Sequence, residues 1–581
     1  MQGVFGKVLV VDLNNLSYRV SELSPNVYPR VIGGKGLGSH LLLEYLPVGV
    51  DPFDPENCLI FTAGPLAGSN VPGSNRYGVF SKSPLTLAYA ESYSGGNVAR
   101  ALKRTGYDAV LIRGTSSTPV FLEISNRNVI FHDAKDIWGA DTYATQEQLL
   151  AKVGVQGAQA VVIGPAGENL VRFACLENNY WRSAGRTGMG AVMGSKKVKG
   201  IVFYGDAETP VAKPEALREW VKAFLARAAE HPAVKSYRTY GTSALVAVMN
   251  TAQGFPATYW EKGVLPGWER LSAEQLLNDY DVKPHACPPC LMSCGKITRV
   301  RTGKYTGLQV EGPEYETIYS FGGLCEIRDL DEIIYLNDLC DRLGLDTIST
   351  GNIIAFALAT ARDGYIDLNV NFGDAAGVAF LVKKIAYREG IGDRMAEGIR
   401  KFAGELGLAE KAVHVKGMEP AGYDPRRLKM MALAYATSAR GACHLRTTFY
   451  KAELSGMLES RSLEEKVALL VDWENRLALY DCLILCRFYR DLIDWKEVGE
   501  LLSLVTGLQA TKDELTRIAS GIIEMTRRFN LREGIGPEQD ALPAAFYKPL
   551  EPGGYRLSRQ EFKEMLSAYY RLRGWSNGYV L

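Results

Sequence analysis

The chain has 581 residues, more than one hydrophobic core usually supports, so two to four domains are expected. Its net charge is +1, which gives no reason to expect nucleic acid or an anionic membrane surface as a partner. Ten cysteines in so long a chain exclude a disulfide scaffold. The N-terminus lacks the pattern of a secretion signal, and no stretch approaches the roughly 20 apolar residues of a membrane span. A cytoplasmic protein without membrane insertion is therefore expected.

Residues 1 to about 208 are expected to be rich in β-strands. Short apolar runs on both sides of Asn14 and Asn15 predict a hairpin. Glycine-dense loops separate the runs, but none fits the Rossmann or Walker pattern, and any single one is better explained as a tight turn. Four such loops together favour a large phosphate-bearing ligand, because glycine loops at helix starts expose backbone N–H groups. The strands are predicted at 8–13, 16–20, 58–62, 109–113, 120–124, 160–163 and 201–204, and the loops at 33–38, 94–97, 164–167 and 185–190.

After a linker at 209–214 the pattern becomes helical. Pro214 is placed for the first turn of a helix. Further along, an apolar stripe ends at Gly344, a C-cap residue, and Asp346 is placed to cap the next helix. The chain changes character again near 415–423, and helical patterns resume at 428–438, 463–485 and 512–529. The sequence therefore predicts an α+β protein with domains at 1–208, 209–414 and 415–581.

Three cysteines, Cys287, Cys290 and Cys294, lie within eight residues. Thiolates this close repel one another, so such a run usually means that a metal shares them. An iron–sulfur cube needs four cysteines, commonly a short run plus a distant one. Structural zinc and buried unligated thiols are the alternatives, but zinc sites more often show two CxxC pairs or a mixture with histidine. The spacing favours a cluster whose fourth ligand comes from elsewhere.

Several further motifs follow one another along the chain. In order they are Pro72-Gly-Ser-Asn-Arg76, Ala184-Gly-Arg-Thr-Gly-Met-Gly-Ala-Val-Met-Gly194, the cysteine run, Glu311-Gly-Pro-Glu-Tyr-Glu-Thr317, Asp341-Arg-Leu-Gly-Leu-Asp346, Arg440-Gly-Ala-Cys-His444 and Asp481-Cys-Leu-Ile-Leu-Cys486. Together and in this order they resemble the motifs of the tungsten-containing aldehyde ferredoxin oxidoreductase family, and the resemblance covers essentially the whole length.

The resemblance implies a fold and a set of cofactors. A glycine-rich β-sheet domain would form the base for a bis-pterin cofactor that holds one tungsten, and two mainly α-helical domains would close over it. A [4Fe–4S] cluster would take Cys486, rather than nearby Cys482, as its fourth ligand. Mg²⁺ is expected at the pterin phosphates, since phosphates recruit hard cations. The implied cofactor-binding residues are Arg76, Gly95, Gly96, Arg182, Ala184, Gly185, Asp341, Asp346 and Asp481.

The resemblance also implies a catalytic glutamate and histidine. The histidine maps onto His444, and the glutamate onto the segment 311–316, where we expect Glu314 first and Glu316 second. Without the resemblance, each would be explained as a helix-start carboxylate or a hydrogen-bonded core histidine. One departure is Ile484, which stands where the family usually has glycine and puts the backbone near Asp481 in doubt.

The implied activity is oxidation of aldehydes to carboxylic acids, with water as the oxygen source. Electrons would pass singly to ferredoxin or to a dedicated iron–sulfur subunit. The alternative in the same family is a low-potential reductase subunit that resembles the tungsten benzoyl-CoA reductases, in which a cysteine such as Cys325 would be an extra tungsten ligand. Cys325 is better explained as a packed thiol. A zinc-holding scaffold is the hypothesis from another class. No Glu-x-x-His motif for a metal bridging two copies occurs, so a homo- or hetero-oligomer stays open.

Overall fold

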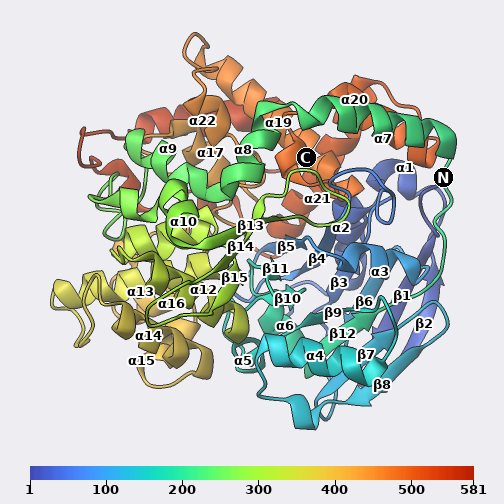
Figure 1. Ribbon diagram of the computed structural model, residues 1–581. Coiled ribbons are helices and arrows are strands. Elements are labelled where there is room, and N and C mark those ends of the chain that lie inside the picture. The colour runs from blue at the N-terminus through green and yellow to red at the C-terminus, as the bar shows by residue number, and fades with distance from the viewer. Residues whose placement is uncertain (581) are drawn as a thin grey trace.

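The computed structural model describes residues 1–580 and confirms the predicted α+β architecture. Two six-stranded sheets occupy the first third of the chain, at the lower right of Figure 1, and the mainly helical parts lie to the left of them and above them in that view. None of the helices in residues 1–580 is long and apolar enough to cross a membrane.

The first sheet combines a parallel pair with antiparallel neighbours. In spatial order its strands are β2 (Ser17–Glu22), β1 (Lys7–Asp12), β6 (Ala109–Arg113), β3 (Leu59–Thr62), β4 (Tyr77–Lys82) and β5 (Tyr89–Ser94). Only β1 and β6 run parallel. The predicted hairpin is the antiparallel pair β1–β2. β4 and β5 were not predicted, because both are buried at every residue and show no alternation of polar and apolar side chains.

The second sheet packs against the first. In spatial order its strands are β11 (Arg182–Ala184), β10 (Leu176–Asn178), β9 (Gln159–Val162), β12 (Val198–Phe203), β7 (Val120–Ile124) and β8 (Val129–Asp133). Apolar side chains from both sheets form one core, in which the rings of Phe61 and Phe203 are 6.0 Å apart. Helices cover the outer faces and the edges: α1 (Tyr28–Val31), α2 (Gly34–Tyr45), α3 (Val98–Arg104), α4 (Thr142–Val153), α5 (Pro165–Glu168) and α6 (Met189–Ser195).

The remaining two thirds are mainly helical. α12 ends at Gly344 in the left-handed conformation, and the Asp346 carboxylate accepts the Ile348 N–H at the start of α13, as predicted. The helices are α7 (Pro214–Ala229), α8 (Pro232–Tyr240), α9 (Leu245–Thr251), α10 (Ala273–Asp279), α11 (Tyr315–Thr317), α12 (Leu330–Leu343), α13 (Thr347–Arg362), α14 (Ala375–Tyr387), α15 (Ile391–Ala396), α16 (Ile399–Glu405), α17 (Lys429–Thr437), α18 (Tyr450–Leu454), α19 (Leu463–Leu483), α20 (Trp495–Thr506), α21 (Lys512–Arg532) and α22 (Arg559–Arg573).

A small antiparallel sheet interrupts the helical part. Its strands are β13 (Asp281–His285), β14 (Gly295–Arg299) and β15 (Gln309–Glu311), and the cysteine run forms the loop between the first two. This sheet was not predicted from the sequence, which was expected to be helical after residue 214.

Apolar cores join segments that are far apart in the sequence. Leu217 and Phe224 of α7 belong to the same core as Leu501 of α20. This core therefore includes residues from both sides of the boundary proposed at 414/415, and the three-domain division stays a prediction.

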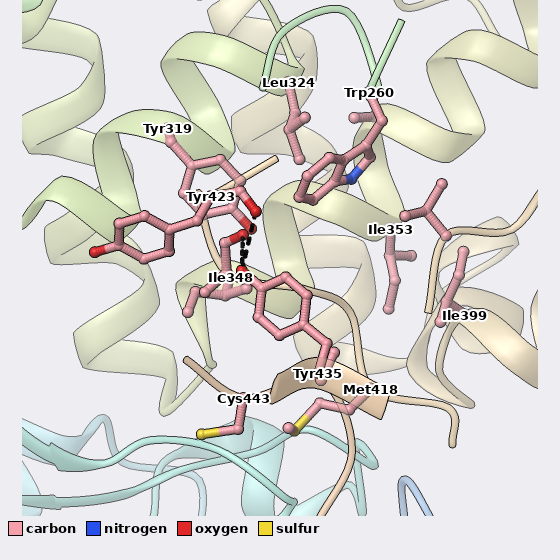
Figure 2. Close-up of a cluster of buried hydrophobic side chains, with 14 of the residues drawn as sticks. Trp260, Tyr319, Leu324, Ile348, Ile353, Ile399, Met418, Tyr423, Tyr435 and Cys443 are labelled. Atoms are coloured by element: carbon pink, nitrogen blue, oxygen red, sulfur yellow. Dashed lines mark hydrogen bonds between the residues drawn. The ribbon is translucent and has the colours of Figure 1, made fainter. Parts of the chain in front are cut away.

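A second core fixes the loop at 415–423. The hydroxyl of Tyr319 donates to the Pro420 carbonyl at 2.5 Å, and that of Tyr435 donates to the Ala421 carbonyl at 3.0 Å. Figure 2 shows these tyrosines among buried side chains that include Trp260, Ile353 and Met418. The hydrogen bonds hold the loop backbone in place beside a central cavity.

Candidate active site and cysteine centre

The cysteine run is held at both ends by the pairing of β13 with β14. His285 and Gly295, which flank the run, are paired across the two strands. The loop between them carries Cys287, Cys290 and Cys294, all partly exposed. The hairpin therefore holds three thiols on one short loop.

Backbone contacts join Cys486 to this loop. Its N–H donates to the Gly73 carbonyl at 2.8 Å, and the Gly73 N–H donates to the Pro289 carbonyl at 3.0 Å. Cys486 also packs against the same apolar core as Cys290 and Cys294. Burial and, after it, the neighbouring Cys486 raise the pKa of Cys290 to about 11. The structure thus brings the four predicted ligands together.

The four thiols are not placed to hold a single metal ion. Among residues 1–580, no three cysteine, histidine, aspartate or glutamate side chains are placed to hold a single metal ion. A [4Fe–4S] cube is a larger group that takes one cysteine at each of its irons. Three cysteines on one loop, with Cys486 joined to that loop through Gly73, supply the four ligands that such a cluster needs.

Two of the implied cofactor-binding residues, Gly95 and Gly96, lie next to the cysteine loop. The Gly96 N–H donates to Cys287 Sγ at 3.2 Å, and a Cβ added at Gly95 would lie 2.9 Å from that sulfur. Arg182 is ion-paired with Glu311, and the negative charges of Cys287 and Glu311 raise the pKa of its guanidinium against the effect of burial. Ala184 is buried at the end of β11.

The central cavity, of about 320 Å³, lies between the two-sheet region and the helical parts. Its walls carry most of the remaining predicted residues, together with several arginines. The predicted residues that line it are Arg76, Gly185, Glu314, Glu316, Asp341, Asp346, His444 and Asp481.

Arg76 connects this cavity with the cysteine centre. Its Nη1 lies 3.6 Å from Cys486 Sγ, and its Nη2 donates to the Tyr93 carbonyl at 3.2 Å. The guanidinium therefore contacts a predicted cluster ligand while the side chain lines the cavity.

Asp341 and Asp346 lie at facing helix ends on one wall. Asp346 Oδ2 accepts a hydrogen bond from Arg186 Nε at 3.0 Å while Oδ1 caps α13. Asp341 accepts from Asn337 Nδ2 at 2.7 Å. Burial, followed by the nearby Glu177, raises the pKa of Asp341 well above its usual range. An uncompensated carboxyl of this kind favours a ligand that presents N–H donors.

Asp481 occupies the last turn of α19 on the opposite wall and is surrounded by cations. It accepts from Arg446 Nη1 at 2.9 Å and is ion-paired with Arg487. The helix ends at Ile484, which adopts the left-handed conformation with φ of 66°. The backbone geometry that a glycine would allow is thus kept by a β-branched residue.

Glu316 and His444 form a pair on the cavity wall. Glu316 Oε1 lies 3.5 Å from His444 Nε2, and Oε2 accepts the Gly422 N–H at 3.0 Å. Burial raises the pKa of Glu316 to about 8. Burial, followed by the charge of Arg186, lowers the pKa of His444 well below its usual value. At neutral pH the pair is a protonated carboxyl beside a neutral imidazole, which suits proton transfer.

Glu314, which we expected to be the catalytic glutamate, has other partners. Its carboxylate accepts from Thr242 Oγ1, and the charges nearest to it include Glu311, Arg182 and Lys296. Burial raises its pKa. The geometry therefore favours Glu316 over Glu314 as the partner of His444.

Several buried polar atoms around the cavity lack partners within residues 1–580. They belong mainly to arginines, which carry donors in a fixed planar arrangement. The atoms are Arg440 Nε, Arg446 Nε and Nη2, Arg487 Nη1, His444 Nδ1, Glu311 Oε2 and Glu316 Oε1. Buried donors and acceptors are normally satisfied, so this wall fits a large polar, anionic ligand such as a pterin with its phosphate.

Apart from Arg76, the arginines of this wall were not predicted from the sequence, and neither was the thiol of Cys443 next to His444. Cys443 accepts from Arg440 Nη2 at 2.8 Å and from the Leu445 N–H at 3.3 Å. Burial would raise its pKa, but Arg440 and Arg446 outweigh burial and lower it to about 6. Arg440 and Cys443 belong to the motif that ends at His444, whereas Arg446 lies outside it, and its hydrogen bond to Asp481 could not be predicted from the motif.

Two other cysteines lie away from these sites. Cys325 follows a π-helical stretch, Ile318–Leu324, and its S–H donates to the Gly351 carbonyl at 3.4 Å within the apolar core. Cys482 is buried against the backbone of Gly36. Neither contributes to the cavity wall.

Comparison with known proteins matches the whole length of the chain. The family model "Aldehyde ferredoxin oxidoreductase, N-terminal domain" matches residues 8–205, and "Aldehyde ferredoxin oxidoreductase, domains 2 & 3" matches 219–581. The tungsten-containing aldehyde ferredoxin oxidoreductase of Pyrococcus furiosus is 35% identical over 99% of this chain and 97% of its own length. That of Thermococcus kodakarensis is 34% identical over the same shares.

Two further proteins are similar to this chain over nearly its whole length. The aliphatic sulfonate oxidoreductase, WOR-like subunit, of Pyrococcus furiosus is 31% identical over 98% of this chain and 94% of its own length. Among solved structures, the active-site complex BamBC of benzoyl coenzyme A reductase with 1,5-dienoyl-CoA has a TM-score of 0.86. That similarity covers 100% of this chain and 96% of the other at 24% identity, and shows the fold.

Proposed function

The chain belongs to the aldehyde ferredoxin oxidoreductase family, and on that premise we propose that it oxidises aldehydes to carboxylic acids with water as the oxygen source. The observation that carries the proposal is the pair of Glu316 and His444 on the wall of the central cavity. The addition of water to a carbonyl requires a proton acceptor, and the Glu316 carboxyl becomes one when it ionises, at a pKa of about 8.

The cofactors implied by the family fit the residues present. When bound, a tungsten bis-pterin supplies a two-electron redox centre and a [4Fe–4S] cluster a one-electron outlet. Asp341 and Asp346 would hold one pterin, and Asp481 the other, through the N–H donors on the pterin edge. Cys287, Cys290, Cys294 and Cys486 would hold the cluster. Mg²⁺ at the pterin phosphates remains part of the proposal.

The proton chemistry is assigned to two side chains. In its ionised form Glu316 takes the proton released when water adds to the aldehyde, and burial raises its pKa to about 8, so this form grows as the pH rises towards 8. His444 lines the cavity, and its Nδ1 has no partner within residues 1–580. That nitrogen is available to the aldehyde oxygen, while Nε2 faces Glu316 and orients the ring.

The alternative, a low-potential reductase subunit, receives less support from this chain. It drew on Cys325 as an extra metal ligand, and that thiol lies in the apolar core with its S–H bonded to a carbonyl. Burial also raises the pKa of Cys325, which disfavours the thiolate form that ligates metals.

The test is anaerobic purification followed by metal analysis and assay of an aldehyde panel with a viologen dye as acceptor. Tungsten, about four irons and absorption near ~400 nm, together with aldehyde-dependent dye reduction, are expected. Zinc alone without dye reduction would support a scaffold instead. Tungsten without aldehyde oxidation, but with dye-dependent reduction of an aromatic thioester, would support the reductase.

A further inference from the structure

A second cavity, of about 290 Å³, lies in the helical part of the molecule and shares no lining residue with the central cavity. It is enclosed by the first turn of α16, residues 409–416 and the segment 539–544. Its volume is near the lower end of the range of about 300–1,000 Å³ that small-molecule sites usually have. The cavity therefore has room for a small organic molecule.

Arg400 brings to this cavity a positive charge that no carboxylate balances. Its Nη2 donates to the backbone carbonyls of Leu85 at 3.4 Å and Thr86 at 3.1 Å, and it forms no ion pair within residues 1–580. Burial and, after it, the charge of Arg172 lower the pKa of the guanidinium. A half-buried charge without a counterion is costly, because burial removes part of its hydration. An anionic ligand would supply the counterion.

His414 adds a hydrogen-bond donor to the same lining. Its Nδ1 accepts the Gly417 N–H at 3.2 Å, so the ring proton is on Nε2, which has no partner in the described part of the chain. Burial and then Arg400 lower its pKa to about 4, so the ring is neutral at pH 7. A neutral ring with one N–H can hydrogen-bond an anion that Arg400 attracts.

The remaining lining is balanced in charge or apolar. Lys416 is buried, and its Nζ lies 2.7 Å from Asp540 Oδ1. Glu410 is exposed at the rim, where water weakens its repulsion of an anion. A carboxylate head with a short apolar tail matches this lining. The apolar lining residues are Ala409, Ala412, Ala541, Leu542, Pro543 and Ala544.

We propose that this cavity binds a small organic carboxylate, with its head at Arg400 and His414 and its tail against the apolar lining. The acid that aldehyde oxidation forms belongs to this class, and this link to the product rests on the proposed function. Inorganic phosphate shares the anionic head but has no apolar tail to bury, so it should bind more weakly.

The cavity is joined to the catalytic pair through the 415–423 loop. The guanidinium of Arg400 lies against Gly417, where an added Cβ would be 3.2 Å from Arg400 Cζ. Further along the same loop, the Gly422 N–H donates to Glu316 Oε2 at 3.0 Å. A carboxylate that fixes Arg400 and His414 therefore restrains the loop that positions Glu316.

The test is an NMR titration of the cofactor-loaded enzyme with isobutyrate, which gives the Kd. Arg400→Gln should raise the Kd about tenfold or more, because it removes the charge and the planar donors. Glu410→Gln should lower it about twofold, because it removes a repelling charge. Arg19→Gln is the matched control, since Arg19 is exposed on β2, on the opposite side of the molecule from α16 (Figure 1).

A second variant guards against a folding defect in Arg400→Gln. Ala544→Phe fills the apolar end of the cavity and leaves Arg400 in place, so it should also raise the Kd about tenfold or more. None of the substituted residues lines the central cavity, so isobutyrate bound there would be unaffected by these changes.

Hydrogen exchange shows where the ligand binds. Isobutyrate should slow exchange at 412–417 in the wild type and fail to do so in Arg400→Gln. A Kd unchanged in both Arg400→Gln and Ala544→Phe, protection confined to the central cavity, or phosphate binding as tight as that of isobutyrate would overturn the proposal. These measurements need no turnover, so an enzyme that oxidises no aldehyde would contradict the proposed function and leave the carboxylate site standing.

Discussion

Glu316 Oε1 lies 3.5 Å from His444 Nε2, and the second oxygen of the same carboxyl is held by the Gly422 N–H. Glu314 lies only two residues earlier but hydrogen-bonds to Thr242 instead. The short segment between them therefore directs one carboxyl toward the imidazole and the other toward Arg182 and Lys296 near the cysteine centre. Two carboxyls that the sequence could not separate are distinguished by their partners.

This difference predicts unequal effects of two matched substitutions. Glu316→Gln should lower kcat by about 10²–10⁴, the usual contribution of general acid–base catalysis, because it removes the proton acceptor. Glu314→Gln should lower kcat by less than about tenfold. Both are measured by dye-linked aldehyde oxidation at equal tungsten content. The reverse order of the two variants would return the catalytic role to Glu314.

The pH dependence of activity should follow Glu316. Its pKa is raised to about 8, so the carboxyl is protonated at neutral pH and becomes a proton acceptor as the pH rises. In the wild type, kcat/KM should climb up to about pH 8 and then level off. His444 stays neutral in this range because its pKa is lowered. Glu316→Gln should abolish the climb, and a rising limb that survives in this variant would assign it to another group.

Iron content should distinguish the two cysteines at the end of α19. Cys486→Ser removes a thiol that contacts Arg76, so iron content and absorption near ~400 nm should fall well below wild type. Cys482→Ser alters a thiol buried next to Gly36 and should retain both signals. Iron per chain, measured after anaerobic purification, decides the matter. Loss of iron in Cys482→Ser alone would contradict the assignment.

At Ile484 the glycine variant should be more stable than the alanine variant. Ile484→Ala removes a buried side chain and should cost about 2–5 kcal/mol, while leaving a non-glycine residue at a left-handed φ of 66°. Ile484→Gly loses slightly more apolar surface but relieves the backbone, so it should be more stable than the alanine variant by about 1 kcal/mol. Denaturant midpoints of the cofactor-loaded proteins give the comparison. An alanine variant that equals or exceeds the glycine variant would show that the backbone carries little strain.

The elements predicted correctly are those that depend on residues close together in the sequence. The β1–β2 hairpin and the Gly344 and Asp346 caps depend on neighbouring residues, and the structure confirms them. β4 and β5 were missed because burial on both faces removes the alternation that identifies a strand. The sheet around the cysteine run was missed because its strands are short and partly exposed.

The motifs identified which residues form the site more readily than which of them are in contact with one another. The motifs identified Glu316 and His444, but Glu316 was ranked below Glu314. The contacts that distinguish the two carboxyls, to Gly422 and to Thr242, cannot be read from the spacing of residues in the sequence. The cations around Asp481 come from segments on both sides of it and from Lys35 through Glu91. Such a network is assembled only by tertiary packing.

Arg186 connects the two-sheet region with both helical parts at the cavity wall. Its guanidinium donates to Asp346 Oδ2 at 3.0 Å, to the Ala442 carbonyl at 3.2 Å and to the Glu419 carbonyl at 2.8 Å. If the cavity holds a pair of pterins, as proposed, a cofactor of that size would have to be loaded before these three bonds close. Once they are closed, its exchange would require the two-sheet region to separate from the helical parts along this seam.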